Sequence, residues 1–151
     1  MFDPAGGTPT SSDALLDRLD GVRDRIEGVT LLGGEPFEQA AALVPFARGV
    51  RERGLSVVAF TGHRLDDLRS DFPPGSRDLL DWVDLLVDGP YVETLPERDR
   101  RWSGSANQRF RFLTGRYSPG VEWIVPGAPE RTVELRLTPD GRLERSGWPE
   151  G

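Results

Sequence analysis

The sequence predicts an α/β fold built on a parallel sheet. Three short apolar segments suit buried strands, and they occupy residues 29–32, 55–60 and 84–88. Helical patterns separate these segments, as parallel neighbours require, because each pair needs a crossover connection. Each segment also runs into a glycine turn, at Gly33 and Gly34, at Gly62 and at Gly89. Because parallel strands end at the same edge of a sheet, we expect the three turns to lie side by side around a binding crevice.

The helical patterns have recognisable starts and stops. Thr10 and Asp13 resemble a capping box for a helix over 11–27, and Gly28 is a plausible stop. A second helix is expected over 37–53. Its core face would contain Phe37, Ala40, Leu43, Val44, Ala47 and Val50. Shorter helices are expected over 64–70 and 77–82.

The last third of the chain changes character. Residues 91–106 read as a polar loop, and 108–113 alternates, with Phe110 and Phe112 facing opposite to the intervening arginines. Segments 132–138 and 142–146 predict a terminal β-hairpin. We therefore expect a core over 1–113 and an extension of the same domain, loop and hairpin, over 114–151.

The amino-acid composition limits the classes of function that the chain could have. The 151 residues suit one domain, and the formal net charge of −6 argues against a nucleic-acid binder, because phosphate binding depends on positive patches. No apolar run approaches the roughly 20 residues that span a bilayer, and residues 1–12 lack the pattern of a secretory signal. We expect a cytoplasmic protein without a membrane partner.

Several chemistries are excluded by missing residue types. The chain contains no cysteine, and its 19 basic residues are all arginine, which removes thiolate ligands, thiol catalysis and Schiff-base lysines. The single histidine, His63, could be imagined with Ser103 or Ser105 as a hydrolase. The Gly-x-Ser-x-Gly turn typical of such enzymes is missing, so hydrolysis is disfavoured.

The turn at 33–36 is the best candidate site. Gly33 and Gly34 let the backbone approach a ligand, Glu35 offers a carboxylate to a cationic group, and Pro36 suits the first turn of a helix. The simpler interpretation is a tight strand-to-helix turn.

Two other groups of residues are open to interpretation. Six arginines form a basic stretch that could dock an acidic partner or simply form a solvated face: Arg98, Arg100, Arg101, Arg109, Arg111 and Arg116. The four tryptophans are expected to be packing residues: Trp82, Trp102, Trp123 and Trp148.

Five segments, in this order, resemble motifs of the radical S-adenosylmethionine activating-enzyme family, most of all the activating proteins of anaerobic ribonucleoside-triphosphate reductase. They are Phe2-Asp-Pro-Ala-Gly-Gly-Thr-Pro9, Val29-Thr-Leu-Leu-Gly-Gly-Glu-Pro-Phe-Glu-Gln39, Val58-Ala-Phe-Thr-Gly62, Val87-Asp-Gly-Pro-Tyr91 and Trp102-Ser-Gly-Ser-Ala-Asn-Gln-Arg109. The resemblance implies a partial radical S-adenosylmethionine β/α barrel with parallel core strands, followed by the hairpin.

The resemblance also implies a site for S-adenosylmethionine. Glu35 would accept from the ammonium group of its methionyl end, beside Gly33, Gly34 and Pro36. The same pocket would be lined further along the sheet by Thr61, Gly62 and Asp88. Asn107 and Gln108 would supply amide groups near the cofactor or the partner. Asp88 could instead cap the next turn, and the two amides could instead be satisfied within their loop.

Family members hold a 4Fe-4S cluster on a Cys-x3-Cys-x2-Cys loop that precedes the position of Phe2. They form a 5′-deoxyadenosyl radical that takes hydrogen from a glycine of a partner glycyl-radical enzyme. This chain has no cysteine and is expected to be inactive in that chemistry by itself.

Three interpretations follow. The chain is a shortened copy of a radical activase, a non-catalytic relative that binds a partner or an adenosyl ligand, or an unrelated α/β binding module. An in-frame cysteine loop in the DNA upstream of Met1 would separate the first from the second. In a shortened copy, the strand over 29–32 is expected to have an unpaired, apolar edge.

Overall fold

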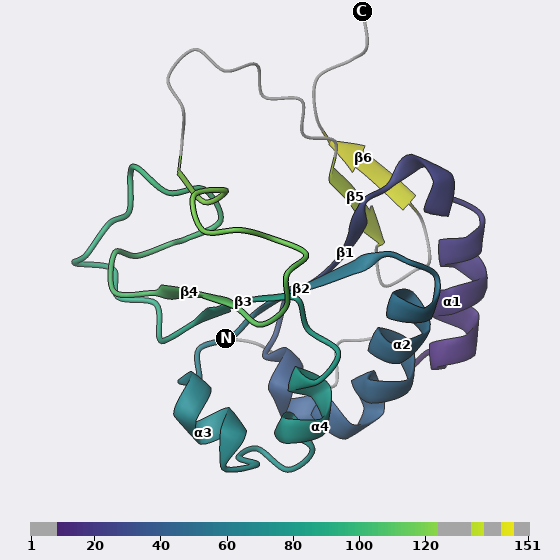
Figure 1. The fold of residues 1–151 in the computed structure, drawn as a ribbon, viewed down its shortest axis with the longest axis horizontal. Helices are drawn as coiled ribbons and strands as arrows, with labels where there is room; N and C mark the ends of the chain where they lie inside the picture. The colour runs from purple at the N-terminus through teal and green to yellow at the C-terminus, as the bar shows by residue number, and fades with distance from the viewer. Residues whose placement is uncertain (1–8, 124–133, 138–142, 147–151) are drawn as a thin grey trace, which may run out of the picture. The chain divides into compact units, whose positions relative to one another are not determined.

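The structure, a computed structural model, describes residues 9–123, 134–137 and 143–146 (Figure 1). The helices are α1 (Ser12–Asp20), α2 (Ala40–Glu52), α3 (Leu65–Arg69) and α4 (Ser76–Leu80), with short 3-10 helices η2 (Arg23–Arg25) and η3 (Pro36–Gln39). The strands are β1 (Gly28–Leu31), β2 (Ser56–Phe60), β3 (Leu85–Asp88), β4 (Arg109–Phe112), β5 (Glu134–Leu137) and β6 (Leu143–Ser146). Residues 10–124 form one compact unit, and the β5–β6 hairpin belongs to another.

The first four strands form an open, mixed sheet in the order β1-β2-β3-β4. β1 pairs with β2 in parallel, and β2 pairs with β3 in parallel, whereas β4 runs antiparallel to β3. The prediction of three parallel strands in chain order is confirmed. The sheet ends antiparallel because a loop, and not a helical crossover, connects β3 to β4.

Helix α2 lies at the centre of the buried apolar core. α2 packs against α1, α4 and β2 (Figure 1), and Phe37, Ala40, Ala47 and Val50 are buried as predicted. Leu43 and Val44 are only half-buried. Phe46, which the prediction left out, is buried at 8% exposure.

The first helix is shorter than predicted. α1 ends at Asp20 with Gly21 as its C-cap, and η2 follows before the sheet begins. The N-cap is Ser11, whose side chain accepts a hydrogen bond from the Ala14 amide at 3.1 Å, so the capping box expected at Thr10 is wrong. Val22 and Ile26, which lie beyond the end of α1, still pack against the core.

Gly28 begins β1 and does not stop a helix. A Cβ atom at this position would lie 1.9 Å from Ser56 Oγ and 2.5 Å from the Ser56 carbonyl oxygen, so the close approach of β1 to β2 requires glycine. β1 is also less covered than expected of a buried strand: Thr30 is exposed, and Leu32 just beyond the strand is 65% exposed. The reason is that β1 is the outer strand of the described sheet.

The predicted terminal hairpin is confirmed as far as the described residues extend. β5 and β6 pair antiparallel, with Leu137 opposite Leu143. The ends of the predicted segments, at 132–133, 138 and 142, lie outside the described residues, as do residues 2–8 of the first family-like segment.

Candidate functional site

The turn after β1 brings a carboxylate to the carboxyl end of the parallel strands. Gly33 and Gly34 have φ angles of 90° and 58°, in the left-handed region that glycine adopts without strain. A Cβ at Gly33 would meet nothing within 4 Å, so the space beside this residue is open. Glu35 follows as the N-cap of η3, where its Oε1 accepts from the Phe37 amide at 3.2 Å, and Pro36 is the buried first residue of η3.

The same carboxylate joins the ends of β1 and β2. Thr61 Oγ1 donates to Glu35 Oε1 at 2.7 Å, and the Gly62 amide donates to Glu35 Oε2 at 2.9 Å. Oε1 therefore accepts two hydrogen bonds and Oε2 accepts one. Because a carboxylate oxygen has two acceptor positions, Oε2 retains one for a further donor. Glu35 itself is partly exposed.

Asp88 at the end of β3 is occupied by the protein itself. Its Oδ2 accepts from the Leu65 amide at 2.8 Å, at the start of α3, and its Oδ1 accepts from Arg111 Nε at 2.8 Å. The side chain is 3% exposed. These bonds join Asp88 to α3 and β4, and not to the turn that follows β3, so Asp88 is a residue that positions α3 and β4.

The third strand end is tied to the second through the backbone. The Thr61 amide donates to the Val87 carbonyl at 3.0 Å, and the Gly89 amide donates to the His63 carbonyl at 2.9 Å. The three glycine turns are therefore neighbours, as their positions after parallel strands predicted.

The two predicted amides, at Asn107 and Gln108, mainly hold loops. Gln108 Oε1 accepts from the Gly104 and Ser105 amides at 2.9 and 3.2 Å, and its Nε2 donates to the Gly89 carbonyl at 3.1 Å. Asn107 Nδ2 donates to the Pro90 carbonyl at 2.8 Å. Asn107 Oδ1 is buried and accepts no hydrogen bond from the described residues.

Three contacts near the site were missed by sequence reasoning. His63 Nε2 lies 3.1 Å from Glu38 Oε1, and the His63 ring meets Phe72 edge-on at 6.1 Å between centroids. Arg111, expected in a solvated basic stretch, pairs with Asp88. Glu38 could have been predicted to lie near the site, because it follows Glu35 by about one helical turn. Phe72 and Arg111 are distant in sequence from the residues they contact, so no local pattern predicted their contacts.

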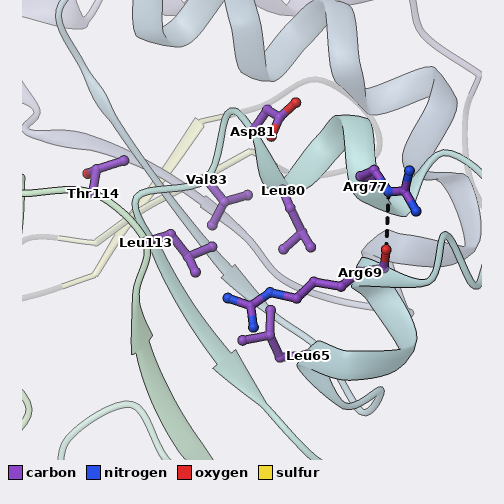
Figure 2. Close-up of a pocket in the computed structure, with 8 residues that line it drawn as sticks. All are labelled: Leu65, Arg69, Arg77, Leu80, Asp81, Val83, Leu113 and Thr114. Atoms are coloured by element: carbon purple, nitrogen blue, oxygen red, sulfur yellow. Dashed lines mark hydrogen bonds between the residues drawn. The ribbon is translucent and has the colours of Figure 1, made fainter.

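A separate hollow of about 290 Å³ lies beside α3 and α4 (Figure 2). It is lined by Leu65, Arg69, Arg77, Leu80, Asp81, Val83, Leu113 and Thr114. The Arg69 side chain extends across it toward Leu113, and Arg77 Nε donates to the Arg69 carbonyl at 3.1 Å (Figure 2). None of the predicted site residues lines this hollow.

The residues do not fit an iron–sulfur cluster. Such clusters are held by cysteine thiolates, and the 151 residues contain none. In the part of the chain that the structure describes, no group of three or more histidine, aspartate or glutamate side chains could hold a metal ion. The same described part also holds no helix that is long and apolar enough to cross a membrane.

An α/β protein with an open, mostly parallel sheet and hydrogen-bonded polar turns at the strand ends is the class that the fold and the site define. The 4Fe-4S single cluster domain family matches residues 2–111, and the chain belongs to this family. No solved structure matches the chain significantly.

The chain is also a distant relative of anaerobic ribonucleoside-triphosphate reductase-activating proteins. It is 30% identical to the protein of Haemophilus influenzae over 62% of this chain and 61% of that protein. The values are 32% for Pasteurella multocida, with the same coverage, and 27% for Escherichia coli, over 70% of this chain and 69% of that protein. The chain thus spans about three fifths of the length of the first two relatives.

Proposed function

We propose that the turns at the strand ends bind S-adenosylmethionine through its methionyl end, as the cofactor-binding part of a radical S-adenosylmethionine activating protein. In this proposal the open sheet is a partial β/α barrel, residues 1–113 are its core, and residues 114–151 are an extension of the same domain. The partner is a glycyl-radical enzyme such as anaerobic ribonucleotide reductase. The names of the relatives and the match over residues 2–111 support this assignment.

The observation that carries the proposal is the geometry of Glu35. Its carboxylate is held in place by Thr61 and Gly62 from the next strand end, and the space beside Gly33, two residues earlier in the same turn, is open. A carboxylate fixed in advance loses little freedom when it accepts from an ammonium group, and one acceptor position of Oε2 is left for this bond. A charge-assisted hydrogen bond of this kind contributes about 1.5–3 kcal/mol.

Isothermal titration with S-adenosylmethionine tests the proposal. The wild-type chain is expected to bind, and Glu35→Ala is expected to weaken binding by about one to two orders of magnitude. Glu38→Ala, which removes a neighbouring exposed carboxylate, is the matched control and should change the affinity little. Circular dichroism confirms that each variant is folded.

Two ligand analogues locate the contact. S-adenosylhomocysteine keeps the ammonium group and should lose affinity in Glu35→Ala as S-adenosylmethionine does. 5′-Methylthioadenosine lacks the amino-acid end, so its affinity should not depend on Glu35. Absence of S-adenosylmethionine binding to the wild type would falsify the proposal, and equal binding by Glu35→Ala would remove Glu35 from it.

The missing cysteines favour a second candidate function: a non-catalytic relative that binds an adenosyl ligand or a partner. Anaerobic incubation of the chain with iron and sulfide, followed by absorption spectroscopy, tests whether the chain can hold a cluster without cysteines. We expect no cluster to be retained by the chain alone. Retention of a cluster would contradict both this candidate and the ligand argument made above.

A further inference from the structure

Exposed apolar side chains concentrate in the loops around β4. Of seven large apolar side chains that are exposed in the described residues, five lie in 91–123, with exposures of 37% to 65%. We call them the aromatic surface: Tyr91, Leu95, Trp102, Val121 and Trp123. The expectation that Trp102 and Trp123 are packing residues is therefore wrong, because their side chains are 42% and 52% exposed. Large exposed apolar groups gathered in this way are typical of interaction sites.

The segments that carry the aromatic surface are bonded to one another. The Ala106 amide donates to the Leu95 carbonyl at 2.7 Å, and the Arg101 amide donates to the Glu122 carbonyl at 2.7 Å. The Tyr91 ring lies against Gly104, where a Cβ would approach it to 3.1 Å. These loops, which Figure 1 shows next to β4, thus hold their side chains in a defined arrangement.

Arg100 links the loops that carry the aromatic surface. Its guanidinium pairs with Glu97, donates to the Gln108 and Ala106 carbonyls at 2.9 and 3.0 Å, and stands 5.3 Å from the centre of the Phe110 ring. The surface is therefore preorganised, which lowers the entropic cost of binding a partner.

The backbone of Trp102 has an unusual conformation. Its φ angle is 66°, in the left-handed region that a bulky side chain rarely adopts. The chain is held on both sides of it, by the Arg101 amide and by the Gly104 amide, which donates to Gln108 Oε1 at 2.9 Å. Backbone strain that the surroundings maintain in this way is found mainly at functional sites.

The charge of these loops differs from that of the whole chain. Residues 91–123 contain six arginines and four acidic residues, in a chain with a net charge of −6. Arg100 and Arg111 pair with Glu97 and Asp88. The other four arginines form no ion pair with any described residue: Arg98, Arg101, Arg109 and Arg116.

We propose that the aromatic surface, with its unpaired arginines, is the docking surface for an acidic region of the partner protein. Tryptophan, tyrosine and arginine are the residues that contribute most to protein–protein binding, and the unpaired arginines complement acidic groups. Tyr91 directly follows Gly89 and Pro90. The side chains of Gln108 and Asn107 donate hydrogen bonds to the carbonyls of these two residues, so the surface adjoins the turn at the end of β3. The proposal rests on the proposed function for the identity of the partner, a glycyl-radical enzyme.

Titration of the full chain with the anaerobic ribonucleoside-triphosphate reductase encoded in the same genome tests this proposal. Trp123→Ser and Arg98→Glu are each expected to weaken binding by at least about tenfold, and the Arg98→Glu effect should shrink at high salt. Arg18→Glu is the matched control that removes an exposed arginine from α1, away from these loops, and it should leave the affinity unchanged.

The outcomes separate this proposal from the proposed function. Glu35→Ala should lose S-adenosylmethionine but keep the reductase. Reductase binding that is absent in the wild type, or that is unaffected by Trp123→Ser and Arg98→Glu, overturns the docking surface and leaves the cofactor site standing. Tight binding of a single-stranded DNA oligonucleotide in place of the reductase also overturns it.

Discussion

Two buried aspartates lie at the two ends of β3 and have different partners. Asp84, just before the strand, is 1% exposed; its Oδ2 accepts from the Val57 amide at 2.8 Å and its Oδ1 from Thr114 Oγ1 at 2.6 Å. Arg51 Nη1 lies 2.9 Å from Oδ1, a charge pairing without the alignment of a hydrogen bond. Asp88 closes the other end of β3. The sequence indicated a role only for Asp88, because no recognisable motif surrounds Asp84.

Replacing Asp84 should destabilise the fold strongly. In Asp84→Asn an amide NH2 replaces one acceptor oxygen and the charge that faces Arg51 is lost, so we expect a loss of about 3–5 kcal/mol in the free energy of unfolding. Urea denaturation followed by circular dichroism measures it. Asp20→Asn, which disrupts an exposed aspartate–arginine pair at α1, is the control and should cost much less. Equal losses in both variants would contradict the role assigned to Asp84.

At the scale of an element, the loop over 97–100 depends on one carboxylate. Glu97 Oε1 accepts from the amides of Arg98, Asp99 and Arg100, and Oε2 accepts from Arg100 Nε. These bonds, first of all that from the Asp99 amide, lower the pKa of Glu97 from 4.5 to about 2. The ionised form is thus the one that the folded loop favours.

The pH dependence of stability follows from the lowered pKa. The contribution of Glu97 is complete above pH 4.5, and it is lost as the pH falls toward 2, because protonation then becomes favourable in the folded state as well. We expect wild type to be more stable than Glu97→Gln at neutral pH, and the difference in melting temperature to shrink between pH 4.5 and 2. A difference that stays constant over this range would argue against the assignment. Thermal melts of both proteins across the range measure it.

At the scale of the whole molecule, the outer strand is the weak point of the described sheet. β1 pairs only with β2 among the described strands, Thr30 is exposed, and Leu32 is 65% exposed. An outer strand offers unpaired amides and carbonyls to another chain, and native proteins discourage such pairing with charged side chains, especially lysine.

A lysine on β1 should therefore reduce self-association. We expect Thr30→Lys to lower the weight-average mass of concentrated samples relative to wild type, measured by sedimentation velocity. Thr94→Lys introduces the same charge in an exposed loop and is the control. If both variants behave alike, net charge and not the strand edge governs association.

The parts of the fold that could be predicted depend on local patterns. β2 and β3 were predicted within a residue, because continuous apolar runs that end in glycine occur in central parallel strands. Gly28 was assigned to a helix stop because glycine serves both roles, and only the distance to Ser56 decides between them. The exposure of Leu32 could not be predicted, since an apolar run is the same at the centre and at the edge of a sheet.

The candidate site, too, could be predicted only where it depends on local patterns. The sequence alone determined the order of strands and helices, the three glycine turns after parallel strands and the membership of the family, because each of these is written in neighbouring residues. Only the tertiary structure decided which oxygen of Glu35 remains available, that Asp88 serves α3 and Arg111, and which aromatic residues are exposed. The first two outcomes depend on partners more than 20 residues away, as with Glu35 and Gly62, which are separated by 27 positions and meet only when β1 lies beside β2.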